Sequence, residues 1–218
     1  METCQDILQA HFKYGRVHST LELVRKEHER IWFSYQQFND WELLSALQAL
    51  VMYCLLRTTL TEPSDIDLPL LLSLKEVMVR LATLHGMQGT LQDTSDRDVV
   101  AFEKWIFDES RRRINLVFRI LTLIMNLSDA ISCTLRQGFA IVPLPSKDLL
   151  WQARTASDWQ LPFRSQEYAI HGMTDDGELL KLSSTFEGIV STKRSWESWC
   201  AEIGEIGILV ALTAQVFR

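Results

Sequence analysis

The sequence of 218 residues lacks the arrangements of cysteine and glycine that mark many binding and catalytic sites. Its four cysteines are widely separated and none forms a Cys-x-x-Cys pair, which argues against a zinc module or a dithiol redox site. The nine glycines are scattered singly, so no glycine-rich phosphate loop is present. Neither a Gly-x-Ser-x-Gly nor a His-Glu-x-x-His motif occurs. We therefore expect free thiols, no metal site and no cofactor.

Long apolar runs and an excess of positive charge are also missing. The most apolar stretch, residues 114–127, is shorter than a membrane span and contains Arg119. The first residues show no basic segment followed by an apolar run, so a signal-peptide pattern is absent. The net charge of −6 argues against nucleic-acid binding, which draws on clustered Lys and Arg. We expect an intracellular chain with no membrane partner and no direct contact with nucleic acid.

What the sequence does contain is enough apolar material for a core. Hydrophobic residues make up 47% of the chain and charged residues 23%, a globular composition that suits one domain of this length. Alternating strand patterns are almost absent, whereas apolar residues recur at helical spacing. The sequence predicts an all-α fold, a single helical domain over residues 1–218 with a long central helix and a proline-rich extended connection.

The central helix is expected to begin at Ser95 or Asp96 and to end within residues 132–137. Acidic residues precede basic ones by four positions in two pairs, Asp108 with Arg112 and Glu109 with Arg113, each worth about 0.3–0.5 kcal/mol if exposed. One helix face carries a polar stripe, and the opposite face is apolar. The stripe consists of Asp108, Arg112, Asn115, Arg119, Thr122 and Asn126.

The segment after the central helix contains two prolines, which favour an extended backbone over residues 142–145. Ser146 is a natural N-cap for a short helix containing Leu149, Leu150 and Trp151. Earlier in the chain, Asn39 or Asp40 caps a helix that continues to residue 55, and Pro69 opens another that ends at His85. Residues 160–180 read as loop-rich, and a final helix carries Trp196, Trp199, Ile203, Ile206 and Leu209.

Two conspicuous features have both a structural and a functional interpretation. The basic triplet Arg111-Arg112-Arg113 could bind an anion, but the acidic residues one turn earlier favour ion pairing within the helix. The seven tryptophans could line an aromatic pocket, but at helical spacing they are more often part of a core. The structural interpretation is favoured for both features.

Four stretches carry a resemblance to a known family, namely residues 47–54, 82–86, 105–113 and 139–151. Together they resemble the fungal-specific transcription factor domain, the helical regulatory region of fungal zinc-cluster and zinc-finger activators. The sharpest match is Trp105-Ile-x-x-Glu109-Ser-Arg-Arg-Arg113, which is similar to the family's Trp-x-x-Trp-x-x-x-Glu-x-x-Arg-Arg helix. The segment from Phe139 to Trp151 is similar to its Leu-Pro-x-Pro element before a tryptophan. The other two are Leu47-Gln-Ala-Leu-Val-Met-Tyr-Cys and Ala82-Thr-Leu-His85-Gly. The resemblance covers about residues 40–160.

The resemblance implies an all-helical, nuclear regulatory domain, often found in factors that control metabolic or secondary-metabolite genes. The sequence departs from the family in two ways. It has no DNA-binding cysteine cluster, so this chain does not read DNA. It also has Thr122 and Asn126 where the family frequently carries an aspartate in a Leu-Asp-x element.

Two functions follow from these observations. The first is a regulatory and interaction domain of a fungal transcription factor that acts through protein partners, self-association or a hydrophobic small-molecule effector. The second is a stand-alone, cytoplasmic relative used as a ligand-binding protein or a cofactor-free enzyme, such as a cyclase or isomerase, in a biosynthetic pathway. The start at Met1 favours a stand-alone chain, and the hydrophobic last residues favour a fragment. The candidate ligand-binding residues are His85, Trp105, Glu109, Arg112, Arg113, Asn115 and Arg119.

Overall fold

A computed structural model describes residues 2–14, 17–59, 67–85, 102–124, 141–165, 170–174, 178–185, 188–193 and 195–216. We expected one helical domain over residues 1–218. The structure divides by internal contacts into two compact units, Met1–Met87 (unit 1) and Gln88–Arg218 (unit 2), and each unit is described by itself.

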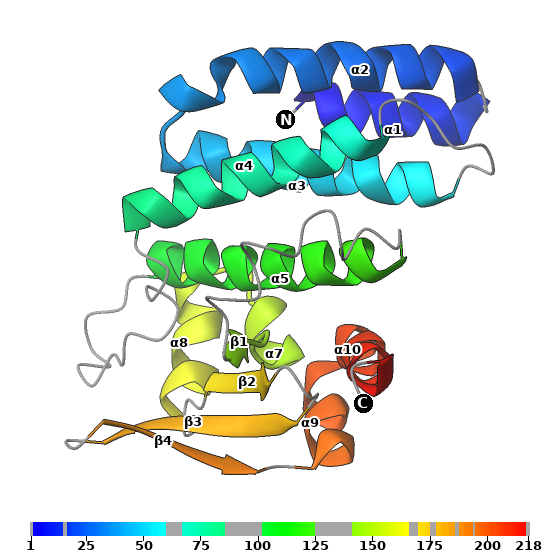
Figure 1. Cartoon of the computed structure of the whole chain (residues 1–218). Coiled ribbons are helices and arrows are strands. Elements are labelled where there is room, and N and C mark those ends of the chain that lie inside the picture. Colours follow the sequence, from blue (N-terminus) through cyan, green and yellow to red (C-terminus); the bar gives the residue numbers. More distant parts are fainter. Residues whose placement is uncertain are drawn as a thin grey trace. The chain divides into compact units, whose positions relative to one another are not determined.

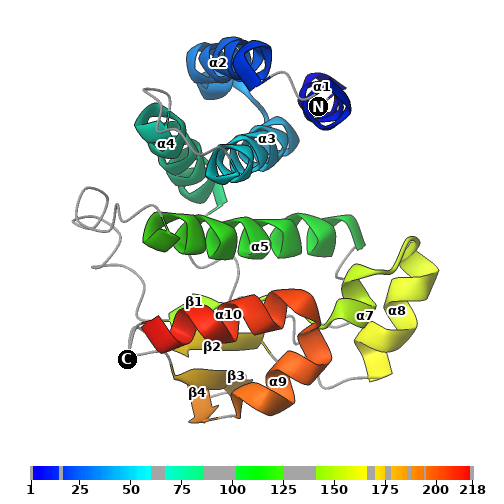
Figure 2. The same cartoon turned by 90° about the vertical axis from the view of Figure 1, so that its right-hand side faces the viewer.

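The described residues of unit 1 form four α-helices, α1 (Glu2–Tyr14), α2 (Val17–Ser34), α3 (Asp40–Thr58) and α4 (Asp67–His85), with the short 3-10 helix η1 (Tyr35–Gln37) after α2 (Figure 1). Figure 2 shows these helices nearly end-on. The predicted cap of α3 is confirmed: the Asn39 side chain accepts from the amide of Glu42, and the Glu42 carboxylate accepts from the amide of Asn39. This reciprocal capping box satisfies two amides that the helix itself leaves unpaired.

The core of unit 1 lies mainly between α3 and α4. Both helices bury long apolar runs because they lie side by side, as expected from their nearly continuous hydrophobic sequence. Arg57, near the end of α3, is buried and its Nη2 donates to Asp67 at the start of α4 at 3.0 Å. The deepest residues of the two helices are Leu43, Leu47, Leu50, Tyr53, Leu70, Leu71, Leu74 and Val77.

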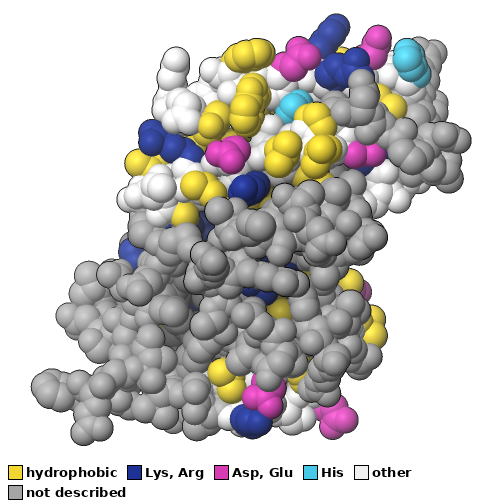
Figure 3. All heavy atoms as spheres, viewed as in Figure 1, with side chains coloured by type: hydrophobic (Ala, Val, Ile, Leu, Met, Phe, Trp, Pro, Cys, Tyr) yellow, Lys and Arg dark blue, Asp and Glu magenta, His cyan; other side chains and the backbone are white. Residues whose placement is uncertain are grey.

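A stripe of exposed apolar side chains runs along α4. Leu68, Leu72 and Val79 are each more than 40% exposed, and their spacing of four and seven places them on one helix face. Figure 3 shows hydrophobic side chains among charged ones over α2 and α4. Unit 1 therefore presents apolar surface that its own core does not use.

A buried histidine connects α2 with α4. The Nε2 atom of His28 lies 2.7 Å from the Ser73 hydroxyl, and the ring also hydrogen-bonds the backbone of Pro69. Burial lowers the pKa of His28, because the charged form loses its hydration, although Glu29 and the Pro69 bond act in the opposite direction.

The depressed pKa of His28 makes the stability of unit 1 depend on pH. Since the folded pKa lies below the unfolded value of 6.5, the unfolded chain binds more protons as the pH falls below that value, and stability decreases. The slope from this one group cannot exceed about 1.4 kcal/mol per pH unit. Urea unfolding at pH 7.5 and at pH 5.5 measures the decrease in the free energy of unfolding between the two. We expect this decrease to be smaller in His28→Gln than in the wild type. An equal pH dependence in both proteins would contradict this account.

Unit 2 combines helices with an antiparallel sheet. The helices are α5 (Phe102–Ile124), α7 (Asp148–Trp151), α8 (Ala156–Ser165), α9 (Trp196–Ile203) and α10 (Glu205–Val216). The strands β1 (Ile141–Pro143), β2 (Ile170–Thr174), β3 (Leu179–Thr185) and β4 (Gly188–Lys193) form one sheet in the order β1-β2-β3-β4. Helices contain most of the described residues, so the predicted helical class is confirmed, and the sheet is an addition that we did not expect.

The sheet was missed because its strands are short and lack clean alternation. β2 carries a buried histidine and a glycine, and β3 changes from apolar to hydroxyl-bearing residues along its length. Pairing across the sheet fixes these strands, as in Met173 opposite Val142 on one side and Leu179 on the other. The region predicted to be loop-rich therefore contains the end of α8 and the strand β2.

The main core of unit 2 lies between α5, the sheet and the two last helices. In both Figures 1 and 2, α5 lies on the β1 side of the sheet, and β4 is the strand farthest from it. Side chains from all of these elements meet in one buried cluster, so α5 packs against the sheet and the last two helices. The cluster consists of Leu116, Ile120, Leu144, Met173, Leu179, Trp199, Ile203 and Val210.

The proline-rich connection is extended, as predicted. Residues Ile141–Pro143 form β1, and the amide of Leu144 donates to the carbonyl of His171 at 2.8 Å. The predicted N-cap, however, was one residue too early: Lys147 occupies that position before α7, and the amide of Ser146 binds Glu109 instead.

The predicted final helix is broken in two. Gly204 has φ of +77° and separates α9 from α10, and its amide donates to the carbonyl of Cys200. This left-handed conformation suits glycine because a side chain would be strained there. The break lets α10 fold back against α9 and bury Val210.

Gly207 is required where α10 approaches α9. A Cβ atom at this position would lie 3.1 Å from the Cα of Cys200 and 3.2 Å from the Cβ of Ile203. We expect Gly207→Val to lower the free energy of unfolding by about 2–3 kcal/mol, because overpacking against backbone is poorly relieved. Ile208→Val, at a 59% exposed position of the same helix, should change it by less than about 0.5 kcal/mol. Chemical denaturation measures both; equal effects would contradict the close approach.

Candidate functional site

A buried carboxylate lies at the centre of the charged residues of α5. Glu109 is fully buried, and its Oε1 accepts from the Nε of Arg113 and from the amide of Ser146, each at 2.9 Å. Its Oε2 lies 2.9 Å from the Nη2 of Arg112. We call these four residues the Glu109 cluster. Two guanidinium groups and one amide around one carboxylate compensate for much of the cost of burying its charge.

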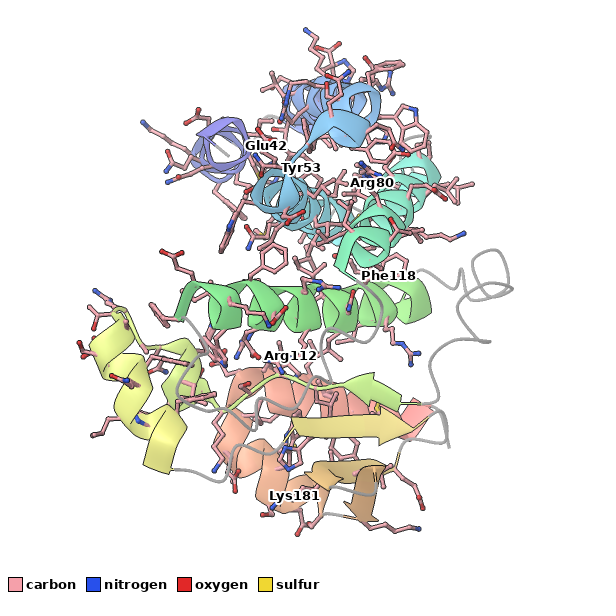
Figure 4. All side chains as sticks on the ribbon, turned by 90° about the vertical axis from the view of Figure 1, so that its left-hand side faces the viewer. Glu42, Tyr53, Arg80, Arg112, Phe118 and Lys181 are labelled. Atoms are coloured by element: carbon pink, nitrogen blue, oxygen red, sulfur yellow. The ribbon has the colours of Figure 1, made fainter. Side chains whose placement is uncertain are left out.

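The arginines of this cluster are themselves covered. Arg112 is 3% exposed, and Figure 4 shows it on the side of α5 that faces the sheet, opposite Phe118. The guanidinium carbon of Arg113 lies 4.2 Å from the centre of the Trp151 ring, a cation–π contact that brings α7 over the cluster. The polar stripe expected on α5 is therefore not a solvated face over its described part, since Arg112 is buried and Asp108, Asn115 and Arg119 are half-buried.

Pairing within the basic triplet is confirmed for Glu109 with Arg113 but extends beyond what we predicted. Arg112 also pairs with Glu109, whereas Asp108 lies 3.8 Å from Arg111 and 3.4 Å from the ammonium of Lys104. The reason is that an arginine three or four residues after an acid can reach it equally well on a helix. Burial, which the sequence pattern did not reveal, gives the two Glu109 pairs a larger effect than exposed pairs have.

Beside the Glu109 cluster lies a group of packed aromatic rings that we call the aromatic corner: Phe102, Trp105, Trp159 and Phe163, from α5 and α8, with Leu150 of α7 beneath them. Ring centres of Trp105 and Trp159 are 5.7 Å apart, and those of Trp159 and Phe163 are 4.3 Å apart. The indole nitrogens of Trp105 and Trp159 are buried and have no hydrogen-bond partner among the residues that the structure describes. Two buried donors without acceptors are unusual in a folded protein.

The sequence-predicted candidates fall into two sets. Trp105, Glu109, Arg112, Arg113, Asn115 and Arg119 all lie on α5; Asn115 and Arg119 are half-buried, and the structure places neither of them in the Glu109 cluster. His85 is the last residue of α4 in unit 1, and its side chain lies outside the described side chains. Ser146, Trp151 and Trp159 were not among the candidates; only the family resemblance pointed to their segment.

The described residues hold no metal site, and burial raises the pKa of each of their free thiols. No three His, Cys, Asp or Glu residues among them gather closely enough to hold a metal ion. Cys4 and Cys54 are buried free thiols, and burial raises the pKa of Cys54 to about 12, so this thiol stays protonated. Cys200 donates to the carbonyl of Gly207. Cys133 lies outside the described residues.

Among the described helices, none has the length and hydrophobicity that crossing a membrane requires. No known protein family, curated protein or solved structure matches this chain.

Proposed function

We propose that this chain is a regulatory and interaction domain of a fungal transcription factor, acting in the nucleus through protein partners or a small-molecule effector. The observation that carries the proposal is the contact between Glu109 and Ser146. Glu109 belongs to the most specific stretch that resembles the family, and Ser146 follows the Leu-Pro-x-Pro-like stretch. A direct contact gives both motifs a common physical purpose, which is to fasten the extended connection to the long helix.

Further contacts support the same interpretation. Trp151, at the end of the second motif, stacks on Arg113 of the first, and Trp159 packs against Trp105. Lys147 forms an ion pair with Glu202 at 3.2 Å, which ties the connection to α9. The exposed apolar stripe of α4 is a surface suited to a protein partner.

A reporter experiment tests the regulatory role. The full chain is fused to a DNA-binding domain of known target and expressed in a fungal host that carries the matching reporter gene. We expect reporter output to differ from that of the DNA-binding domain alone, and Glu109→Gln to abolish the difference because it destabilises unit 2. Glu178→Gln, at an exposed ion pair, should keep it. Unchanged output from a well-expressed fusion would contradict the proposal.

A second candidate function is small-molecule binding at the aromatic corner. The two unpaired indole donors favour it, because a ligand with an acceptor oxygen would satisfy them. Glu109 already accepts hydrogen bonds from Arg113 and from the Ser146 amide and forms an ion pair with Arg112, so the candidate concerns binding and not turnover. A native mass spectrum of the chain, recorded after incubation with a fungal metabolite extract, tests it. A bound mass in the wild type that is lost in Trp159→Phe supports binding, whereas a bare chain in both contradicts it.

A further inference from the structure

An arginine and a serine beside the start of α8 take no part in the fold. Arg154 and Ser157 are both exposed, and neither side chain makes a hydrogen bond or an ion pair with any residue that the structure describes. The capping function belongs to their neighbour Thr155, whose hydroxyl donates to Asp158 at 2.7 Å and accepts from its amide at 3.2 Å. Ser157 is thus an accessible hydroxyl with an unpaired cation three residues before it.

This arrangement is the substrate pattern of arginine-directed protein kinases, whose acidic subsites bind a guanidinium three residues before the acceptor hydroxyl. We infer that Ser157 is a phosphorylation site for a kinase of this class. In the transfer, the Ser157 Oγ forms a bond to the γ-phosphorus of ATP. The bond from that phosphorus to the β–γ bridging oxygen breaks, ADP leaves, and the hydroxyl proton passes to the kinase's catalytic carboxylate.

Structure separates this serine from other positions with the same spacing. Three more arginines precede a Ser or Thr by three residues: Arg16 before Ser19, Arg80 before Thr83, and Arg119 before Thr122. The Thr83 hydroxyl donates to the carbonyl of Arg80 within α4, and Ser19 already has a bonding partner. Thr122 belongs to the last turn of α5, and its side chain lies outside the described side chains. Among the side chains that the structure describes at these positions, Ser157 alone combines an exposed hydroxyl, no partner and a place in the first turn of a short helix.

The first turn of α8 is also easier to open than a helix interior. Pro162 lies within the helix and has no N–H, so the carbonyl of Asp158 lacks its usual donor four residues later. A kinase needs its substrate extended around the acceptor, and residues 154–158 can supply that while Trp159 and Phe163 hold the rest of α8 in the aromatic corner. The phosphate would then sit beside Arg154 and the helix N-terminus, which favour it, and beside Asp158, which repels it. These effects offset one another, so the modified chain stays folded and displays a new charge.

The test uses the folded full chain, ATP and the catalytic subunit of an arginine-directed kinase. Intact-protein mass measures the rate, and the tryptic peptide Thr155–Arg164 locates the phosphate by fragmentation. We expect one phosphoryl group on Ser157, none on that peptide in Ser157→Ala, and a rate at least about tenfold lower in Arg154→Ala, since losing a charge-assisted contact of about 1.4 kcal/mol has that effect. Ser195→Ala is the matched control, because Ser195 is exposed and follows Lys193 and Arg194 at the wrong spacing; it should leave the rate unchanged.

Several results would overturn the inference. They are phosphate on Ser195, Ser19 or Thr155 with Ser157 unmodified, an unchanged rate in Arg154→Ala, or modification of the heat-unfolded chain but not of the folded one. Circular dichroism of each variant confirms that the comparison is between folded proteins.

Discussion

Replacing Glu109 with glutamine is expected to lower the free energy of unfolding of unit 2 by about 3–5 kcal/mol, because removing the charge of one partner of a buried ion pair is strongly destabilising. Here two guanidinium groups, from Arg112 and Arg113, lose their counter-charge in a buried setting. The amide of Ser146 keeps at most a weaker bond to the neutral side chain. Urea denaturation of the two proteins, followed by circular dichroism, measures the difference.

The matched control is an ion pair on the surface. Lys193 and Glu178 join β4 to the start of β3, but their side chains are 76% and 38% exposed. Glu178→Gln should lower the free energy of unfolding by less than about 1 kcal/mol, since solvent already screens the pair. If Glu109→Gln proved no more harmful than Glu178→Gln, the buried cluster would not hold unit 2 together.

Truncating Trp159 to alanine is the second change with a large expected effect. Its ring is 4% exposed and lies within 6 Å, centre to centre, of the rings of Phe102, Trp105 and Phe163. Loss of a buried tryptophan leaves a cavity that packed rings fill poorly, so we expect the free energy of unfolding to fall by about 3–5 kcal/mol. Thermal and urea unfolding both report this quantity.

Leu161 supplies the comparison within the same helix, because it is 78% exposed. Leu161→Ala should change the free energy of unfolding by less than about 0.5 kcal/mol. Trp159→Phe keeps a ring but removes the indole N–H. Its effect on the free energy of unfolding should lie between those of Trp159→Ala and Leu161→Ala. A small effect of Trp159→Ala would mean that α8 is not docked on α5 through this corner.

Local signals predicted the start of α3 and the end of α4 well. Asn39 or Asp40 was the predicted cap of α3, and the structure places Asn39 there, with Glu42 completing a capping box that depends on nothing else in the chain. The extended connection at Pro143 and Pro145 was equally local, since proline restricts its own backbone and that of the preceding residue. In such places one or two residues determine the conformation.

Features that depend on distant residues were not predictable from pattern. The sheet of unit 2 exists because short segments pair with one another, as Ser183 pairs with Val190, and no single strand carries a clear alternation. The break at Gly204 was hidden by apolar residues that keep helical spacing on both sides of it. Likewise, Arg112 looks like a surface residue in the sequence, and only the surrounding elements bury it.

The candidate site shows the same division. Glu109 and Arg113 were predicted to pair because they are four residues apart on a helix. Ser146 lies 37 residues from Glu109, and a separation of this length does not predict the hydrogen bond between them. The family resemblance covered both segments, that of Glu109 and that of Ser146. Reasoning from residue spacing alone predicted only the ion pair within the helix.

The most direct test of the account is the hydrogen-exchange rate of the Ser146 amide. If Glu109 fastens the proline-rich connection to α5, this amide is strongly protected in the wild type, although it belongs to no helix or strand. The protection should be lost in Glu109→Gln and kept in Glu178→Gln. An amide that exchanges at the unprotected rate in the wild-type protein would contradict the account at its centre.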